Sequence, residues 1–454
     1  MNLSIVNRSK LNEECRLDAE FYSPDKLHAE TLVCSKPFLS MVAEPCRLIA
    51  GPFGSTVTTD MYVKEPVFRY IRGKDIQNFF IDESDPVFVG KGVFEHLPQF
   101  QLQESDLLVT VVGMNFGKVA LVFSEDCPAI FSCKSTVIRN PAVNPIYLSA
   151  FLSCRYGHSL LRRGRRGAAQ PGINLFDLRH IPVPVLPDEL QSTVQTYVLE
   201  ARERMRYSKA LYSEASKELL TALNLNSWKA GTNTNFVSRF KQVIVSRRMD
   251  AEYFQPKYTA MLQGIPATVR LDRLGKLVSI KKGLEVGSAA YSESGVPFWR
   301  VSNLTRTGLD KGNLIFIDES LYENLRTDHE PRRGEILLSK DATPGVAFFL
   351  EEDTSGIVSG GILRLNLVTD IEPHYLELVL NSTFVQMQIE RESGGSVIRH
   401  WKPSGVKGTL IPRLGARERD LAGMVQESHR ARKESNRLLD RAKRLIEDAI
   451  EAEF

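Results

Sequence analysis

The amino-acid sequence predicts an α+β protein built from two tandem mixed α/β domains, each followed by a long helix. Three observations support this fold class: a phrase that occurs twice, short strand-like runs after each copy, and two long helical stripes. Residues 16–24 (RLDAEFYSP) return as residues 248–256 (RMDAEYFQP), at an offset of 232 residues (248 − 16). Because this period is much longer than a solenoid repeat, it indicates a duplicated domain.

Further phrases recur in the same order along the two halves. The paired segments are 51–55 with 283–288, 70–76 with 298–304, 106–109 with 335–338, 117–120 with 344–347, and 181–184 with 409–412. The last pair has an offset of 228 residues (412 − 184). Five collinear matches at nearly one offset are hard to obtain by chance, so we interpret the chain as an internal repeat.

Short β-branched and aromatic runs, punctuated by Gly, Pro and Asn, predict the strands of each mixed domain. The predicted strands lie within residues 86–89, 106–109, 109–112, 120–123, 314–317, 335–338 and 346–350. The segment 224–236 is rich in Asn, Thr, Ser and Gly, which is typical of a linker between domains.

Each half ends in a segment whose apolar or small residues step by threes and fours, which predicts a helix. The first runs over residues 188–223, without Gly or Pro, and the second carries its stripe from 421 to 449. We expect the two helices to pair as an antiparallel coiled coil; the alternative is that each packs only on its own domain. The predicted boundaries are 1–187 (first domain), 188–223 (central helix), 224–247 (linker and start of the second repeat), 248–415 (second domain) and 416–454 (C-terminal helix).

Composition excludes several classes of protein. A hydrophobic fraction of 43% and a charged fraction of 25% are ordinary for a globular protein. No run of eighteen apolar residues predicts a membrane span, and the first residues lack the apolar core of a secretory signal, so we expect a cytoplasmic protein. The net charge is only +3, so an acidic partner would need local basic patches. Six cysteines, all in the first half and without a C-x-x-C pair, predict reduced and mostly buried thiols and no metal site.

Segments that resemble catalytic motifs fail on inspection. Residues 113–119 are one residue short of a nucleotide-binding loop and carry Val119 where Ser or Thr should bind magnesium. Residues 84–88 lack the second proline of an amino-methylation phrase, and Ser359 lacks a Gly-x-Ser-x-Gly frame. We interpret the repeated Arg-x-Asp-Ala-Glu phrase as an anchor between each domain and its helix. No catalytic residue is expected, so the chain is predicted not to be an enzyme.

Together these phrases resemble the specificity subunits of type I restriction-modification systems. The resemblance spans essentially the whole chain and is carried by segments 51–55, 70–76, 300–304 and the Ile-Pro-Val-Pro run at 181–184 before a helix. It implies two target recognition domains that dock on double-stranded DNA and a helical spacer between them. It also implies two methyltransferase subunits and a motor-nuclease subunit as partners. S-adenosylmethionine would then bind to the methyltransferase and no cofactor to this chain.

The expected DNA target is bipartite. A helix of about 33 residues is roughly 50 Å long at ~1.5 Å per residue, which equals about 15 base pairs of DNA. Because the two domains differ outside their shared framework, the two half-sites are expected to differ as well. The alternative is an adaptor that brings another defence or repair complex to DNA without methylation.

Candidate DNA contacts fall in two groups. Arginine forks suit phosphates and guanine edges, so the first group consists of one basic cluster in each half. These residues are Arg155, Arg162, Arg163, Arg165, Arg166 and Gln170 in the first half, and Arg391, Arg399, His400, Lys402 and Lys407 in the second. The first cluster could be the solvated end of a helix or a loop that reaches outward. We favour the loop.

The second group lies in the repeated strand-turn segments, where donors and acceptors mix as base edges require. These residues are Arg72, Lys74, Asp75, Gln77 and Asn78, and their partners Arg300, Ser302, Asn303, Thr305 and Arg306. Arg72 and Arg300 are shared, so each is either structural or a phosphate contact, whereas Lys74 and Gln77 are favoured for reading sequence. Ser55, Lys281, Lys282 and Lys340 complete the candidates.

Overall fold

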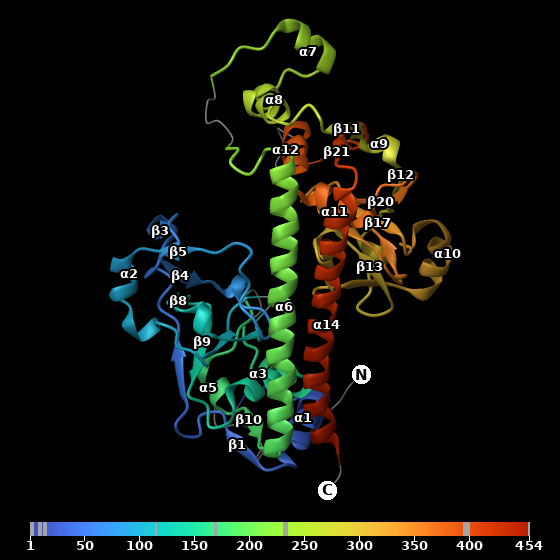
Figure 1. Ribbon diagram of the computed structural model, residues 1–454. Coiled ribbons are helices and arrows are strands. Elements are labelled where there is room, and N and C mark those ends of the chain that lie inside the picture. Colours follow the sequence, from blue (N-terminus) through green and yellow to red (C-terminus); the bar gives the residue numbers. More distant parts are fainter. Residues whose placement is uncertain are drawn as a thin grey trace. The chain divides into compact units, whose positions relative to one another are not determined.

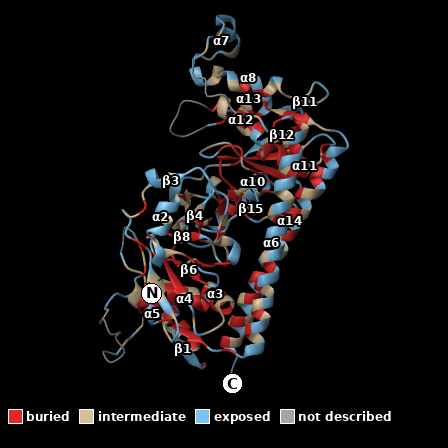
Figure 2. Ribbon diagram, turned by 60° about the vertical axis from the view of Figure 1, so that its left-hand side comes forward, coloured by how far each residue is buried: buried red, intermediate tan, exposed pale blue. Residues whose placement is uncertain are grey.

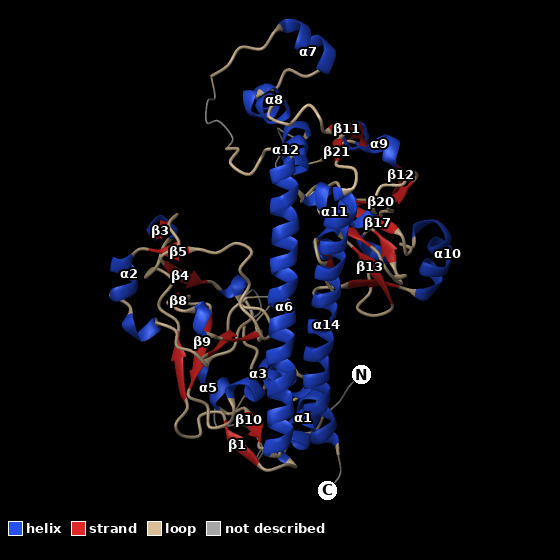
Figure 3. Cartoon of the chain, in the orientation of Figure 1, coloured by secondary structure: helices blue, strands red, loops and turns tan. Residues whose placement is uncertain are grey.

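A computed structural model describes residues 4–7, 11, 16–113, 116–167, 170–229, 235–393 and 400–452. The chain divides into two compact units: the first holds residues 1–205 and 433–454, and the second holds residues 206–432. Each unit combines helices with short strands (Figures 1 and 3), which confirms the predicted mixed α+β class. The domain boundaries drawn from the sequence stay predictions.

The first unit contains the following elements. Its helices are α1 (Pro24–Cys34), α2 (Lys91–Glu95), α3 (Pro145–Ser153), α4 (Arg155–Arg163) and α5 (Leu175–Arg179), with short turns η2 (Thr59–Met61), η3 (Gly73–Asp75), η4 (Pro98–Phe100) and η5 (Ser124–Asp126). Its strands are β1 (Phe38–Ser40), β2 (Arg47–Ala50), β3 (Tyr62–Val63), β4 (Phe68–Ile71), β5 (Phe88–Val89), β6 (Leu107–Thr110), β7 (Val119–Leu121), β8 (Ala129–Phe131), β9 (Ser135–Arg139) and β10 (Pro182–Pro184). They form sheets of order β2-β9-β6-β7, β3-β5-β4-β8 and β1-β10.

The second unit repeats this plan. Its helices are α7 (Phe240–Ser246), α8 (Pro256–Gln263), α9 (Leu274–Leu277), α10 (Glu319–His329), α11 (Pro373–Asn381), α12 (Thr383–Glu392) and α13 (Pro403–Gly408), with turns η6 (Ala251–Phe254), η7 (Ser288–Ala290) and η8 (Val301–Asn303). Its strands are β11 (Arg270–Arg273), β12 (Val278–Lys282), β13 (Val296–Trp299), β14 (Leu304–Thr305), β15 (Gly308–Leu309), β16 (Ile315–Ile317), β17 (Glu335–Ser339), β18 (Ala347–Phe349), β19 (Ile357–Val358), β20 (Ile362–Leu367) and β21 (Leu410–Arg413). The sheet β12-β20-β17-β18 matches β2-β9-β6-β7, and β11-β21 matches β1-β10.

Every residue of the central strand of each unit, β6 and β17, is buried; Figure 2 colours the chain by burial. Side chains alternate along a strand, so Leu107 and Val109 of β6 pack in a core with α3, whereas Leu108 packs with β4 and β8. In β17, Ile336 and Leu337 divide in the same way between two cores. This double burial explains why these strands read as continuous apolar runs in the sequence.

Equivalent hydrogen bonds recur in both units, which confirms the internal repeat. The Tyr147 hydroxyl donates to Pro184 O over 2.7 Å, and the Tyr375 hydroxyl donates to Pro412 O over the same distance. Both residue pairs are separated by one offset of 228 residues (375 − 147 and 412 − 184). A buried hydroxyl needs a partner, so each tyrosine fixes the strand that leads into the following long helix.

A buried ion pair braces each central strand. Arg139 at the end of β9 donates from Nε to Asp106 Oδ1 (2.9 Å) and from Nη2 to Oδ2 (2.6 Å). Arg364 of β20 holds Glu335 in the same two-bond geometry, at 2.7 and 2.9 Å, and both side chains are at most 4% exposed. Burial raises the pKa of Glu335, but hydrogen bonds from Arg364 and from a backbone N–H outweigh burial and leave its pKa below the ordinary value.

The long helices α6 (Asp188–Ala222) and α14 (Arg417–Glu451) each have 35 residues, close to the predicted bounds (Figure 1). In the first unit, Ser435 Oγ donates to Ala201 O over 2.6 Å and Arg441 Nη2 donates to Tyr197 Oη over 3.0 Å. The partner numbers rise in one helix and fall in the other, so the two segments run antiparallel. None of the helices in the described part of the chain combines the length and apolar character that a membrane span requires.

Two expectations drawn from the sequence are wrong in detail. Of the described cysteines, only Cys154 is buried, while Cys34 is exposed at the end of α1 and the rest are half-buried; the thiols are therefore free but not mostly buried. The strand expected at 109–112 ends earlier, at Thr110 of β6, because Gly117 N donates to Thr110 O and closes a turn there. The strand expected at 120–123 is observed as β7, which ends at Leu121.

We predict that Glu335→Gln lowers the free energy of unfolding by roughly 3–5 kcal/mol, because it leaves the Arg364 charge buried without a counter-charge. Urea denaturation measures the change. The folded-state pKa of Glu335 lies below its ordinary value of 4.5, so the wild-type advantage is present above that pH and is lost as the pH falls. Glu323→Gln, which removes the exposed partner of Arg326, should change stability little. Equal losses in the two variants would contradict the prediction.

Candidate nucleic-acid interface

Loops at the strand ends of the first unit meet through backbone hydrogen bonds. Ser132 N donates to Ile71 O over 3.0 Å, and Gly113 N donates to Pro171 O over 2.9 Å. At this junction a Cβ on Gly51 would lie 2.1 Å from Ser132 O, so only glycine fits. The first loop surface is defined as residues 51–55, 72–78, 132–134 and 170–172.

Arg72 and Asp75 shape the turn of the first loop surface. Asp75 Oδ2 accepts hydrogen bonds from Arg72 N and Arg72 Nε, and Oδ1 accepts from Nη2, each over 2.9 Å. In the second unit, Asn303 Oδ1 accepts from Arg300 N over 3.2 Å and closes the equivalent turn. Asp75 and Asn303 are buried. This geometry favours the structural alternative for Arg72 and Arg300, and the roles of all four residues in DNA binding stay predictions.

Other candidates of the first loop surface reach solvent. Lys74 Nζ lies 2.7 Å from Asp85 Oδ2, and both side chains are more than half exposed. Such an exposed ion pair is weak, so Lys74 can exchange this carboxylate for a phosphate. Ser55, Asn78 and Gln170 are exposed. Gln77 is half-buried, and its Oε1 accepts from Lys118 Nζ over 2.5 Å.

Lys134 is a basic residue of this surface that the sequence analysis missed. Lys134 is exposed in the turn between β8 and β9. A Cβ added to Gly73 would lie 3.1 Å from the Cβ of Lys134. Lys134 therefore stands beside Lys74, although 60 residues (134 − 74) separate the two in the chain. No local pattern marks Lys134, because only the parallel pairing of β4 with β8 brings the two turns together.

The arginines at the end of α4 are engaged within the first unit. Arg163 Nε donates to Phe21 O over 3.0 Å, and its guanidinium pairs with Glu30 at 2.5 Å. Arg166 makes two hydrogen bonds to Asp177, at 2.7 and 3.0 Å. The expected loop that reaches outward is therefore wrong for Arg163 and Arg166. Both guanidinium groups bind carboxylates of the first unit instead.

The remaining arginines of this cluster differ in their partners. Arg165 lies 3.2 Å from Glu20, and Arg155 pairs with Glu451 at the end of α14. The Arg162 guanidinium lies 5.1 Å from the centre of the Phe116 ring, and no carboxylate of the described residues pairs with it. Arg162 is thus the least engaged member of the cluster. DNA contact by any of these arginines stays a prediction.

The repeated Arg-x-Asp-Ala-Glu phrase is structural, as expected, but it contacts another element than the long helix. Arg16 donates to Asp177 Oδ1 over 3.2 Å and to Arg165 O over 2.9 Å. Its counterpart Arg248 donates to Glu392 O, at the end of α12, over 2.8 Å. The phrase therefore anchors the start of each repeat to the last helices of its domain, which corrects the expected anchor to the long helices.

The second unit forms an equivalent surface. Ser359 N donates to Trp299 O over 2.8 Å, and Trp401 N donates to Lys340 O over the same distance. A Cβ on Gly283 would lie 2.1 Å from Ser359 O, the distance found at Gly51. The second loop surface is defined as residues 281–284, 300–306, 340–341, 359–361 and 400–402.

Candidates of the second loop surface also divide into engaged and free groups. Lys340 pairs with Asp341, and His400 Nδ1 lies 2.8 Å from Asp341 Oδ1. The exposed candidates are Lys281, Lys282, Ser302, Arg306 and Lys402. Arg399 lies outside the described residues. The site residues of both surfaces therefore stay predictions, with the exposed ones placed where a ligand could reach them.

Comparison with known proteins bears on what these surfaces bind. No family model matches the chain. The type I restriction enzyme EcoKI specificity subunit of Escherichia coli (strain K12) is 21% identical over 345 residues. The chain is similar to a type I specificity subunit. This finding confirms the resemblance that the sequence motifs carried. The aligned region covers 71% of this chain and 66% of the relative, just under two thirds of the relative's length.

Two solved structures are also similar. The S subunit of a type I restriction-modification system from M. genitalium has a TM-score of 0.44 at 14% identity, over 92% of this chain and 96% of its own. The HsdS subunit from Thermoanaerobacter tengcongensis has a TM-score of 0.28 at 18% identity, over 91% of this chain and 98% of its own.

We predict that Arg72→Ala and Lys74→Ala differ in their effect on stability, although they lie in one turn. Loss of Arg72 leaves the buried Asp75 carboxylate without its ion partner, which should cost roughly 1–3 kcal/mol of unfolding free energy. Lys74→Ala removes only an exposed pair and should leave the unfolding midpoint unchanged. Urea denaturation of the two variants measures both. Equal midpoints would contradict the framework role of Arg72.

Proposed function

We propose that the chain is the DNA-binding specificity subunit of a type I restriction-modification system. One observation carries the proposal: the two units present the same loop surface on a duplicated framework, with different exposed side chains on each. The similarity to the EcoKI specificity subunit supports the choice of this family.

The exposed side chains define how the target would be read. In the first unit Lys74 lies within the framework turn and Asn78 follows it, and in the second Ser302 and Arg306 take the equivalent places. Side chains of different length and charge favour different base edges. We therefore propose an asymmetric bipartite target, with phosphates contacted by lysines of both surfaces.

The paired helices α6 and α14 are proposed to act as the spacer between the two recognition domains. A helix of 35 residues is about 52 Å long at ~1.5 Å per residue, the length of about 15 base pairs of DNA. Polar contacts within the apolar stripe, such as that of Ser435 with Ala201 O, fix one register, as buried polar residues do in coiled coils. A fixed register would set a fixed distance between half-sites.

The chemistry is proposed to lie with partner subunits. Two methyltransferase subunits, which bind S-adenosylmethionine, and a motor-nuclease subunit would assemble on this chain, which itself is proposed to be non-catalytic. The deciding experiment is a genome-wide map of adenine methylation in the host, with and without the gene. Loss of one split, asymmetric motif on deletion is expected. An unchanged map would contradict the proposal and favour an adaptor that acts without methylation.

We predict that Lys74→Ala combined with Lys134→Ala weakens binding to duplex DNA. Binding releases fewer counterions when a phosphate contact is lost. The slope of log affinity against log salt should therefore become shallower by ~0.9 per lost contact. Fluorescence anisotropy at several salt concentrations measures the slope. Lys91→Ala on α2, an exposed lysine outside the first loop surface, is the control and should bind as the wild type does. An unchanged slope in the double variant would exclude these lysines as phosphate contacts.

We predict that exchange of residues 248–412 for the same segment of a related protein changes one half of the methylated motif and leaves the other half alone. The reason is that each unit has its own loop surface and its own cores. Methylation mapping of cells that carry the chimaera measures the motif. A change in both halves would show that the domains do not read independently.

A further inference from the structure

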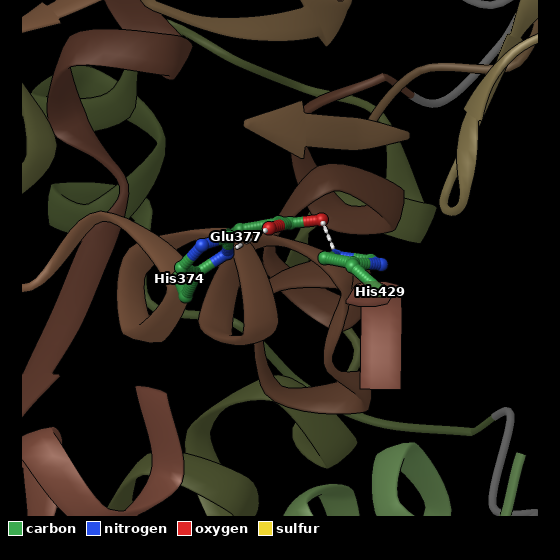
Figure 4. Close-up of side chains that lie close together, drawn as sticks. All are labelled: His374, Glu377 and His429. Atoms are coloured by element: carbon green, nitrogen blue, oxygen red, sulfur yellow. Dashed lines mark hydrogen bonds and ion pairs between the residues drawn. The ribbon is translucent and has the colours of Figure 1, made fainter. Parts of the chain in front are cut away.

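Three side chains that can bind a metal converge inside the second unit. His374 and Glu377 lie one helical turn apart on α11, and His429 lies on α14 (Figure 4). Their ligand atoms all lie within 4.8 Å of one another, and all three residues are buried. No metal site was expected from the spacing of the cysteines. His374-x-x-Glu377 on a helix was the available signal, but His429 is 52 residues further along (429 − 377).

The distances fit the edges of a coordination shell. Glu377 Oε2 lies 3.1 Å from His374 Nδ1, and Glu377 Oε1 lies 2.8 Å from His429 Nε2. Zinc bonds of ~2.0–2.2 Å to nitrogen and oxygen place neighbouring tetrahedral ligands roughly 3.3–3.5 Å apart. Small side-chain movements therefore bring two imidazole nitrogens and a carboxylate oxygen around one ion.

The surroundings of His374 resemble the outer shell of a metal site. Its second ring nitrogen, Nε2, lies 3.2 Å from Glu351 Oε1, and Gln426 Nε2 donates to the same oxygen over 3.2 Å. Histidines that bind metals with one nitrogen commonly donate the other N–H to a carboxylate, which fixes the tautomer and the ring. Glu351 is thus placed to orient His374 with Nδ1 free to bind an ion.

Charge balance points in the same direction. Glu377 is 0% exposed, and a buried carboxylate needs a counter-charge. A proton on one imidazole would supply one. One proton, however, accounts for one imidazole, whereas two imidazoles converge on this carboxylate. Glu377 and Glu351 together carry the two negative charges that a divalent cation balances.

We propose that His374, Glu377 and His429 bind a zinc ion that ties α11 to α14 in the second unit. Two nitrogens and one oxygen form a ligand set that zinc accepts. The fourth position is left to water. Tyr212 lies near this position, with its ring 6.3 Å from that of His429.

The role of the ion would be structural. α11 packs against β18 and β21 of the second unit, and α14 is the long helix of the proposed spacer. A zinc ion between them stabilises the folded state by its binding free energy. The site does not depend on DNA binding, so it is tested without DNA.

The experiment uses the full chain, freed of metal by a chelator and then titrated with zinc. Zinc content and competition with a chromophoric chelator measure binding, and thermal unfolding measures its effect. One zinc per chain and a higher unfolding temperature with zinc are expected. His429→Gln should abolish binding, and Glu351→Ala should weaken it by roughly 10- to 100-fold as an outer-shell change. His96→Gln, an exposed histidine after α2, is the control and should bind as the wild type does.

The outcomes that would overturn the site are equally defined. Zinc retained by His429→Gln at the wild-type stoichiometry would place the ion elsewhere. A wild-type chain whose unfolding temperature does not respond to zinc would leave a proton as the counter-charge of Glu377. Because a variant could fail to fold, cobalt(II) is added to the wild-type chain as a second measurement. Visible absorption typical of a tetrahedral ion is expected, and its absence would contradict the proposal.

Discussion

The ion pair between a buried carboxylate at the start of the central strand and an arginine of the neighbouring strand is the constraint on which each unit depends. Asp106 with Arg139, and Glu335 with Arg364, join β6 to β9 and β17 to β20. The central strand is packed on both faces, so its register decides what every surrounding loop presents. A charge pair that is costly to break fixes that register in both halves of the chain.

Because these ion pairs fix the central strands, the residues around them divide into fixed turns and exposed positions that can vary. Turns such as Arg72 with Asp75 and Arg300 with Asn303 are held by their own hydrogen bonds, and the glycines at 51 and 283 admit no side chain. Exposed residues between these fixed points can change without disturbing the fold. A duplicated framework with freely varied surface residues is what a protein that reads two different sequences requires, and it is the basis of the proposed function.

Each unit meets its segment of α14 through polar contacts. In the first unit, α4 meets α14 through Arg155 and Tyr156, which both contact Glu451. In the second, α11 meets α14 through Glu377 and His429, and both residues are buried. A buried polar contact is more costly to leave unsatisfied than an exposed one, which is why the second junction, and not the first, points to an additional ligand.

The sequence by itself determined the repeat, the mixed α+β class and the long helices, because these depend on local periodicity and on phrases that recur in order. The predicted helix 188–223 is observed as Asp188–Ala222. Only the tertiary structure decided which polar side chains are free. It turned Arg163 and Arg166 inward to carboxylates, placed Lys134 beside the Lys74 turn, and joined His429 to Glu377. These outcomes depend on partners distant in the chain, and residue type and spacing carry no information about such partners.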